Sequence, residues 1–471
     1  MKIVNWKLKN EYNYLRIEYI ILFFIALRLI GITNAPLEIA HNWRQVTGLM
    51  VSRNFFEIDP AFWFPRVDET NGGTGIIGME FPLLNYLHYF VSLLFDYTHW
   101  YGRLINLLVT SLGIYFFYKL IEDKLNWKTA YYASIFLLGS VWFTYSRKVM
   151  PDTFCMGISF IGLYFANLYL KKQQLKHFIF FLGFLTLGFL SKISAVICIV
   201  AIPFLMNELH SIKTRVVLTV GLVFCLITTY IWYFEWNPYL SMTYGNWYHS
   251  GTDIQSGFNE LIENPLASLK QFYFSSFHSF LASILFLISF IYLLIQKHYH
   301  LLTFLTISLV IFFLYMAKSG SVFYIHTYYI IPIVPVFAII IGYYLASLKN
   351  VKITVGIVFL FLIESIANQQ HDFFIKPSET YKLTLEEISS KYSDRTDLIA
   401  INGNGNPQEL YLSHRKGWVL INSQCNDPEY IERIKQKGCK FLIINRHSYE
   451  QILPYKIKFE NKDYRIYGIA D

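Results

Sequence analysis

The sequence predicts an α-helical protein that crosses a membrane many times and carries a small α/β domain at its C-terminal end. Hydrophobic residues make up 54% of the 471 residues and charged residues only 15%. Soluble domains usually carry about 25% charged residues, so a soluble enzyme is excluded. The apolar residues gather in runs long enough to span a bilayer. Beyond residue 370 the charges return and the apolar runs become short.

Eleven apolar runs are predicted to be membrane-spanning helices, because each approaches the roughly 20 residues that a helix needs to cross the hydrocarbon core. They cover residues 15–33, 104–121, 129–146, 153–170, 177–191, 194–209, 215–233, 277–295, 301–317, 329–346 and 353–369. A twelfth run, 82–95, is shorter and contains Asn85 and His88. We expect this run to lie at the membrane surface.

The positions of the basic residues predict the orientation of the chain. If 82–95 does not cross, one set of short loops is rich in lysine and includes Lys119, Lys171 and Lys349. Such enrichment is typical of the cytoplasmic side. We therefore expect a multi-pass protein of the cell (inner) membrane, with a cytoplasmic N-terminus and an extracytoplasmic C-terminus. The net charge of +8 is explained by these loops, and no nucleic-acid partner is expected.

Two domains follow from this orientation. Residues 1–369 form the transmembrane domain, in which 34–103 is an extracytoplasmic loop with juxtamembrane helices. Residues 370–471 form the extracytoplasmic α/β domain, with strand-like runs at 398–401, 418–421 and 441–444 and a helix at 428–438.

Five cysteines form no metal-binding pattern. Cys155, Cys198 and Cys225 lie in apolar runs and are interpreted as packing residues. Cys425 and Cys439 share the polar C-terminal region, where they either form one disulfide or remain free.

Ionisable residues gather at the predicted outer face, where they are costly and therefore functional candidates. The first outer loop contains Glu38, His41, Arg44, Arg66, Asp68 and Glu80. A solvated loop is the alternative, although aromatic residues such as Phe62 and Trp63 favour a segment at the interface. The glycines between 72 and 78 predict a mobile turn.

Three further clusters fall on the same predicted side. They contain Arg147 with Asp152, then Lys192, and finally His326 with Tyr328. Each has a simpler interpretation: snorkelling of Arg147 or Lys192, helix capping by Asp152, or an interfacial position for His326. Together they predict an outer cavity in which carboxylates deprotonate an acceptor or hold a metal, and cations hold a phosphate leaving group.

The order of these motifs resembles the GT-C glycosyltransferases that use polyprenyl-phosphate sugars. That superfamily includes the dolichyl-phosphate-mannose protein mannosyltransferases and the aminoarabinose transferase of lipid A. The resemblance is best over 15–210, weakens to 330, and returns at His326–Pro335. It is carried by residues 38–45, 64–66, 80–83, 145–152, 190–192 and 328–335.

The resemblance implies a membrane glycosyltransferase of GT-C fold that moves a sugar from polyprenyl phosphate to a glycan, lipid or protein acceptor. It implies catalytic roles for Glu38, Asp152 and Glu80, and substrate binding by His41, Arg44, Arg66, Arg147, Lys192, His326 and Tyr328. Glu38 stands six residues before Arg44, farther than in relatives, so the base is Glu38, Asp152 or Asp68. Glu80 can bind a divalent cation, and no other cofactor is expected.

Two other functions fit the same composition. A transporter or flippase of lipid-linked sugars would carry charges at the membrane midplane, with repeated halves. A polysaccharide polymerase or ligase would use the same donors but transfer whole chains. The charges at one face and the lack of a repeat favour the single-sugar transferase.

Overall fold

The computed structural model describes residues 15–39, 41–206, 211–245 and 251–470, which form two compact units. The first, here called the helical unit, contains the described residues up to 32 with 106–229 and 251–370. The second, the loop–sheet unit, contains 33–105, 230–250 and the residues from 371 onward. One unit boundary therefore falls near residue 370. The predicted outer loop 34–103, in contrast, groups with the C-terminal residues.

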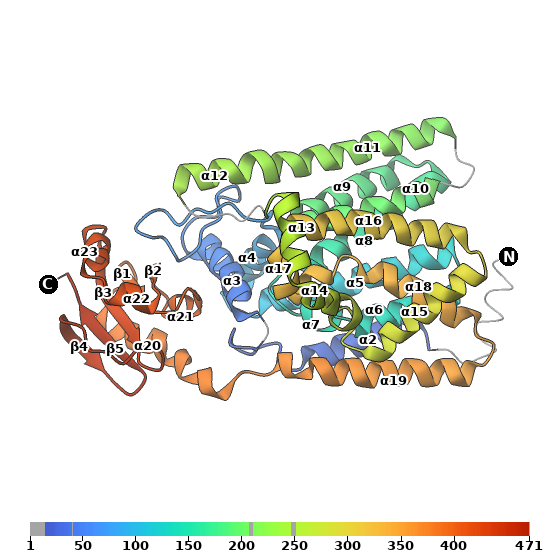
Figure 1. Ribbon diagram of the computed structural model, residues 1–471. Helices are drawn as coiled ribbons and strands as arrows, with labels where there is room; N and C mark the ends of the chain where they lie inside the picture. The colour runs from blue at the N-terminus through green and yellow to red at the C-terminus, as the bar shows by residue number, and fades with distance from the viewer. Residues whose placement is uncertain (1–14, 40, 207–210, 246–250, 471) are drawn as a thin grey trace. The chain divides into compact units, whose positions relative to one another are not determined.

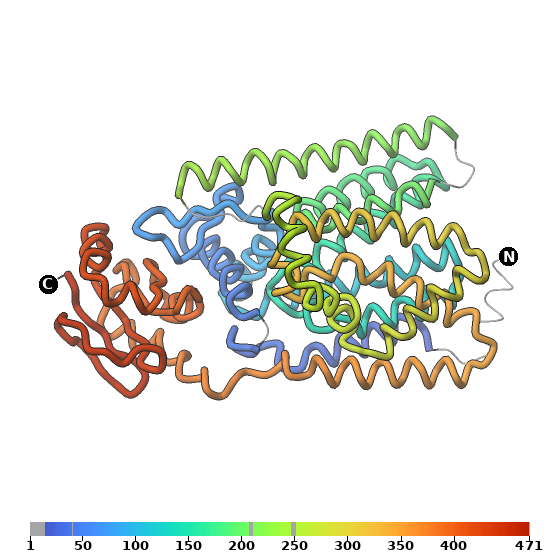
Figure 2. The backbone as a smooth tube through the Cα atoms, in the orientation of Figure 1, coloured from blue at the N-terminus to red at the C-terminus, as the bar shows by residue number. Residues whose placement is uncertain are grey.

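The helical unit consists of helices, the longest of which share one general direction in Figure 1. They are α2 (Ile17–Leu29), α5 (Tyr101–Lys124, whose first turn belongs to the other unit), α6 (Trp127–Gly139), α7 (Trp142–Tyr145), α8 (Pro151–Lys172), α9 (Leu175–Ser191), η1 (Ile193–Val200), α10 (Ala201–Met206), α11 (Ile212–Tyr230), α13 (Ile254–Glu263), α14 (Pro265–Lys270), η3 (Gln271–Ser275), α15 (Phe280–Ile295), α16 (Tyr299–Ser319), α17 (Ser321–Ile325), η4 (Thr327–Ile330), α18 (Val334–Ser347) and α19 (Val351–Gln369). Figure 2 traces the same backbone.

Every predicted spanning run coincides with at least one of these helices, although the end of the run 194–209 lies outside the described residues. Among the described residues, five helices are long and apolar enough to cross a membrane, and a sixth candidate is a pair bent by 90°. The chain is thus a multi-pass membrane protein, but the count of eleven spans is not confirmed. Several helices, such as α9 and α18, are too short because breaks interrupt their apolar runs.

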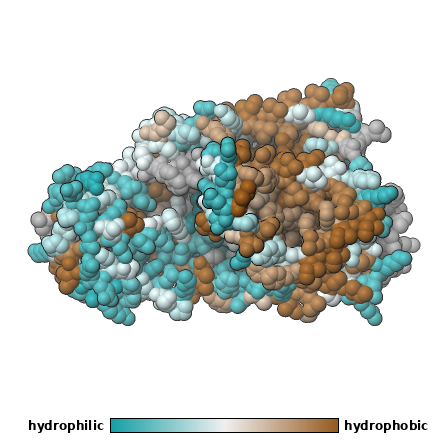
Figure 3. All heavy atoms as spheres, viewed as in Figure 1, coloured by the Kyte–Doolittle hydropathy of each residue, from teal (hydrophilic) through white to brown (hydrophobic). Residues whose placement is uncertain are grey.

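Apolar side chains cover the visible face of these helices, as Figure 3 shows in brown, whereas the sheet region is mainly hydrophilic. Between helices, small residues allow close packing, as is common in membranes. A Cβ atom on Gly113 of α5 would lie 2.3 Å from the Cα atom of Gly157 on α8. This contact fixes α8, whose first turn carries Asp152.

The loop–sheet unit contains the helical segments α3 (Asn42–Glu57), α4 (Leu83–Phe95), η2 (Ile231–Trp236), α12 (Asn237–Tyr244), η5 (Gln370–Phe373), η6 (Pro377–Thr384), α20 (Leu385–Tyr392), α21 (Gln408–Leu412), α22 (Asn422–Cys425) and α23 (Pro428–Gln436). With 13 residues, α4 is about 20 Å long and too short to cross a bilayer by itself.

The described part of the C-terminal region contains a five-stranded sheet with the strand order β2-β1-β3-β5-β4. Its strands are β1 (Leu398–Ile401), β2 (Lys416–Val419), β3 (Cys439–Asn445), β4 (Lys456–Glu460) and β5 (Tyr464–Gly468). Strand β1 pairs in parallel with β2 and β3, whereas β5 pairs antiparallel with β3 and β4. The first three strands and α23 confirm the predicted α/β pattern.

Cys425 and Cys439 are free, buried thiols in the core beside this sheet. Of the two predicted alternatives, the structure therefore shows the unbridged one. Burial raises the pKa of Cys425 to about 11 and that of Cys439 to about 12. Both thiols consequently stay protonated at neutral pH and act as small packing residues, as do the buried Cys155, Cys198 and Cys225.

The glycine-rich segment of the first loop is docked on the sheet, so the predicted mobile turn is wrong. The backbone N–H of Asn71 donates to the carbonyl of Gly417 at 3.1 Å, and the Gly417 N–H donates to the Asp68 carbonyl at 3.0 Å. A Cβ atom on Gly72, whose φ is +81°, would lie 3.1 Å from both Trp418 and Lys437. The loop 33–105 is therefore held by the C-terminal residues.

The buried Glu409 gives this unit a testable pH dependence. Burial raises its pKa above the ordinary value of 4.5, while Asn445 and Tyr464 donate hydrogen bonds to it at 2.6 and 3.2 Å. The folded state then binds a proton that the unfolded state has lost. The contribution of Glu409 to the stability of the folded state is therefore fully present below pH 4.5. It is lost as the pH rises through the raised pKa of the folded state.

We expect Glu409→Gln to flatten the decline of Tm with pH, measured by the unfolding of the full chain in detergent. The exposed Glu429→Gln serves as the matched control and should keep the wild-type pH profile. A Glu409→Gln variant with an unchanged profile contradicts this assignment.

Candidate active site

The helical unit brings an acid and a base from two of the predicted clusters into contact. Asp152 lies in the first turn of α8, after Pro151 starts the helix, where the helix dipole favours a negative charge. Lys192 follows the last residue of α9 and separates it from the 3₁₀ helix η1. Lys192 Nζ lies 2.5 Å from Asp152 Oδ1, and the two side chains are only 10% and 3% exposed.

A third predicted cluster forms an aromatic wall around this pair. Lys192 Nζ lies 4.8 Å from the ring centroid of Tyr328 and 5.6 Å from that of Tyr329. The imidazole of His326 stacks on Tyr328 at 5.3 Å between ring centroids. Aromatic faces attract a cation, so they hold the ammonium group where water is scarce.

The second oxygen of Asp152 is buried and accepts no hydrogen bond from any described residue. A carboxylate usually accepts several hydrogen bonds when it is buried. The oxygen Oδ2 is therefore chemically different from Oδ1, which the lysine neutralises. It can accept a proton or a hydrogen bond from a ligand.

Arg147, by contrast, is fully buried and engaged with backbone. Its Nε donates to the carbonyl of Arg28 at 3.0 Å and its Nη2 to that of Ile30 at 2.9 Å. It thus satisfies carbonyls at the C-terminal end of α2, where a cation complements the helix dipole. These two hydrogen bonds tie Arg147 to the end of α2.

In the loop–sheet unit, Glu38 is fully buried. One of its carboxylate oxygens lies 3.5 Å from Arg103 Nη2. The same guanidinium donates to the carbonyl of Asn34 at 2.6 Å and to Gln45 Oε1 at 3.1 Å. Glu38 also pairs through its backbone with Ile375, so it ties the first loop to the chain that follows α19.

Arg44 and Glu80 contact each other and remain partly exposed, at 27% and 18% of their side chains. They come from α3 and from the segment before α4. Arg66 pairs with Asp59 at 2.9 Å rather than with either of them. His41 precedes α3 with a left-handed φ of 52° and is half-buried. Arg44 and Glu80 therefore form an accessible ion pair, as do Arg66 and Asp59.

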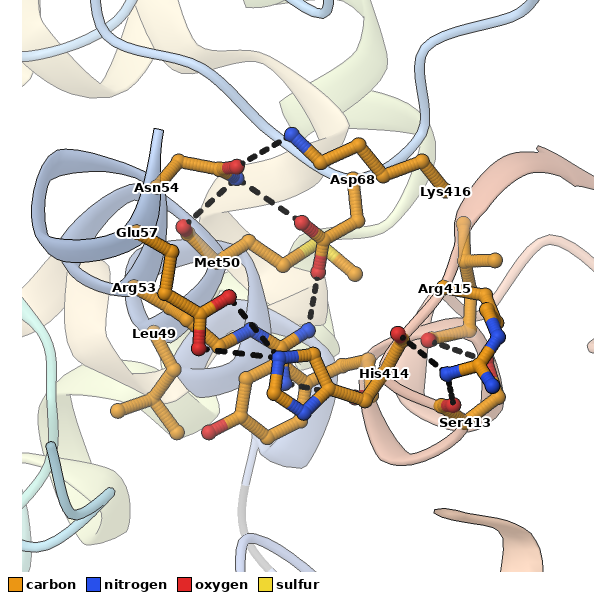
Figure 4. Close-up of polar contacts among 12 residues, drawn as sticks. Leu49, Met50, Arg53, Asn54, Glu57, Asp68, Ser413, His414, Arg415 and Lys416 are labelled. Atoms are coloured by element: carbon orange, nitrogen blue, oxygen red, sulfur yellow. Dashed lines mark hydrogen bonds and ion pairs between the residues drawn. The ribbon is translucent and has the colours of Figure 1, made fainter. Parts of the chain in front are cut away.

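Asp68 belongs to a buried network that connects α3 to the C-terminal residues (Figure 4). Arg53 Nη2 donates to Asp68 Oδ2 at 2.6 Å, and Asn54 Nδ2 donates to Oδ1 at 2.9 Å. Arg53 also donates to the carbonyl of Tyr411, and Lys416 donates to Asn54 at 2.6 Å. Both oxygens of Asp68 are occupied, which favours a structural role over that of a base.

Two buried arginines were missed by the sequence interpretation. Arg28 and Arg103 lie inside or at the edge of apolar runs, and both are fully buried. An ionisable residue in such a run is itself a signal, because it must have a compensating partner. That rule would have selected both residues.

The Arg53–Asp68 pair yields a stability prediction. We expect Asp68→Asn to lower the free energy of unfolding by about 3–5 kcal/mol, because it leaves the Arg53 charge buried without its partner. The control is Asp59→Asn, whose ion pair is 39% exposed on the Asp59 side and should cost less than about 1 kcal/mol. Denaturant titration followed by tryptophan fluorescence measures both, and equal losses contradict the prediction.

Comparison with known proteins gives one family match in sequence. The model of the dolichyl-phosphate-mannose-protein mannosyltransferase family matches residues 80–233. This range contains Glu80, Arg147, Asp152 and Lys192. A search of curated proteins finds no match to the chain.

Solved structures match over nearly the whole chain. ArnT from Cupriavidus metallidurans in the apo state matches with a TM-score of 0.63 and 13% identity, covering 96% of this chain and 98% of that one. The same protein bound to undecaprenyl phosphate matches with a TM-score of 0.58 and 12% identity, covering 95% of this chain and 97% of that one. An Archaeoglobus fulgidus oligosaccharyltransferase matches with a TM-score of 0.58 and 12% identity, covering 90% of this chain and 68% of that one.

Because the identities are only 12–13%, these structural matches establish a shared fold alone. The family match covers residues 80–233, and the fold match covers nearly the whole chain. The predicted resemblance is thereby confirmed, in sequence over residues 80–233 and in fold over nearly the whole chain.

Proposed function

We propose that this protein transfers a sugar from a polyprenyl-phosphate donor to the hydroxyl group of a glycan, lipid or protein acceptor. The observation that carries the proposal is the buried Asp152–Lys192 pair, which offers an unused carboxylate oxygen beside a cation. The matched region contains both residues, and one matched structure has undecaprenyl phosphate bound.

The proposal includes an orientation. The N-terminus is cytoplasmic, eleven segments cross the inner membrane, and the loop–sheet unit lies outside. The lysine-rich short loops support this orientation through the positive-inside rule. The N-terminal loop 1–14, which contributes three of those lysines, lies outside the described residues.

The proposed reaction is a single inverting displacement at the anomeric carbon. Asp152 Oδ2 accepts the proton of the acceptor hydroxyl, and the hydroxyl oxygen forms a bond to the anomeric carbon. The bond from that carbon to the phosphate oxygen breaks, and its electron pair leaves with the polyprenyl phosphate. A correctly placed base typically contributes about 10²–10⁴ in rate.

Lys192 supplies the positive charge for the leaving phosphate. Its ammonium group has three donors, of which Asp152 uses one at 2.5 Å. Tyr328 and Tyr329 hold it in a water-poor setting where electrostatic stabilisation is strongest. Tyr328 and His326 bind the donor phosphate, and Arg44 and Glu80 of the loop–sheet unit bind the acceptor. Glu38, fully buried beside Arg103, acts as a structural anchor of the first loop.

A divalent cation fits these residues poorly. Among the described residues, no three His, Cys, Asp or Glu side chains form a group suited to a metal ion. The Glu80 carboxylate contacts Arg44, whose guanidinium occupies the place that a cation would take. We therefore assign no step to a metal ion.

The main test is a transfer assay with purified protein in lipid nanodiscs and a radiolabelled polyprenyl-phosphate sugar. We expect Lys192→Met to lower kcat by about 10²–10³ and Asp152→Asn by about 10²–10⁴. The double variant, which leaves no buried charge unpaired, separates lost chemistry from lost folding.

Lys171 and Asp123 provide matched controls, because they form the same kind of pair at 2.6 Å but are 35% and 37% exposed. Lys171→Met and Asp123→Asn should retain turnover. Near-normal turnover in folded Lys192→Met and Asp152→Asn contradicts the assignment. Movement of the labelled lipid without a new glycosidic bond would instead favour a flippase.

Chelation tests the metal-independent mechanism. Because Arg44 compensates Glu80, treatment with EDTA should leave turnover within twofold of the untreated enzyme, whereas Arg44→Ala should lower it about tenfold or more. Loss of activity with EDTA, restored by a divalent cation, contradicts this part of the proposal.

A further inference from the structure

A π turn interrupts the helix that precedes residue 245. Residues Ile231–Trp236 form η2, and the N–H of Asn237 bonds to the carbonyl of Trp232, five residues back. Pro238 follows and lacks the N–H that would bond to the carbonyl of Phe234 in a regular helix. The wider turn is thereby explained, and such turns often occur at functional sites.

The residues after this turn carry buried polar atoms without partners. Asn237 is fully buried, and neither its Nδ2 nor its Oδ1 has a hydrogen-bond partner among the described residues. The same holds for Oγ of Ser241, which lies one helical turn further on the same face. Buried polar groups are nearly always paired, so these three atoms indicate a polar ligand.

Trp232 and Trp236 lie just before Asn237 in the chain, and both contact Trp63 of the first loop. The ring of Trp63 lies 5.9 Å from that of Trp232 and 6.4 Å from that of Trp236. The indole N–H of Trp236 donates to the carbonyl of Trp63 at 3.1 Å, and that of Trp232 to the carbonyl of Met79 at 3.0 Å. Each of these two indole rings is held by one hydrogen bond, and Trp63 remains 55% exposed.

Gly78 connects this region to the ion pair of Arg44 and Glu80. A Cβ atom there would lie 2.6 Å from the carbonyl oxygen of Asn237 and 2.9 Å from Ser241 Oγ. The chain before Glu80 therefore lies directly on the helix at these two residues. Glu80, which contacts Arg44, is only two residues away.

We infer that Asn237, Ser241, Trp63 and Trp236 form a subsite of the loop–sheet unit that binds the pyranose ring of a sugar substrate. A pyranose has an apolar C–H face that packs on indole rings, and hydroxyls at its edge. A carboxamide donates one hydrogen bond and accepts another, which matches two neighbouring hydroxyls. The sugar reaches the amide when the half-buried Trp236 and the π turn shift. This inference rests on the proposed function.

The test uses the near-isosteric variant Asn237→Leu in the transfer assay, with Met242→Leu as control because Met242 lies on the same helix and is 86% exposed. Donors are polyprenyl-phosphate-linked glucose, galactose, mannose and N-acetylglucosamine. The monodeoxy analogues of whichever sugar the wild type uses best are then compared.

We expect Asn237→Leu to raise the donor KM about tenfold while kcat stays within twofold, since the lost hydrogen bonds hold the sugar and not the reacting atoms. At least one monodeoxy analogue that the wild type uses about tenfold less well should become equivalent to its parent sugar in the variant. Trp63→Ala should also raise KM, and Trp63→Tyr should preserve it.

An unchanged KM and analogue profile in Asn237→Leu, together with a higher Tm, overturns the inference and leaves a structural water at the amide. If the wild type transfers no sugar, the proposed function fails, and binding of soluble methyl glycosides decides the inference separately. Tryptophan fluorescence quenching that is present in the wild type and lost in Asn237→Leu supports a sugar site. No quenching in the wild type overturns it.

Discussion

The contact between Asp152 and Lys192 is the interaction on which the proposed chemistry depends. Both groups are nearly inaccessible to water, so each is stable as an ion only because the other is present. Three separate chain segments converge to make this contact: the start of α8, the end of α9 and the aromatic residues of η4. A single ion pair thereby concentrates an acid oxygen and an ammonium group where electrostatic effects are large.

The loop–sheet unit also contains a buried ion pair, and there its role is structural. The Arg53–Asp68 pair and the backbone contacts of Gly417 hold the first loop against the C-terminal sheet. Asp68 has both oxygens occupied, whereas Asp152 retains one without a partner among the described residues. In the proposed mechanism, the carboxylate with both oxygens hydrogen-bonded is structural, and the carboxylate with one oxygen left over is the base.

Local composition predicted those strands and helices whose residues all lie in the same kind of environment, buried or exposed. The four-residue apolar run Leu398–Ile401 is β1 with the same bounds, because a strand buried in the middle of a sheet is apolar along its length. Strand β4 was missed because Lys456–Glu460 lies at the edge of the sheet and mixes charged with apolar residues. The number of full spans could not be derived, since hydropathy does not always reveal where an apolar run is broken, as the run 329–346 is between η4 and α18.

The site was predicted as residue types on one side of a membrane, without their pairing. Asp152 and Lys192 are 40 residues apart, and only the packing of α8 on α9 selects them as partners. Arg103 was missed because it lies at the end of an apolar run, whereas most of the predicted site residues lie in loops. Asn237 carries no motif, and only the missing hydrogen bonds distinguish it.

A structure of the protein with polyprenyl phosphate bound tests the central claim most directly. The account predicts a phosphate oxygen within about 3 Å of Lys192 Nζ, with Asp152 on the side of the acceptor. A phosphate held elsewhere, with the ammonium group of Lys192 touching only Asp152 and the tyrosines, would contradict it.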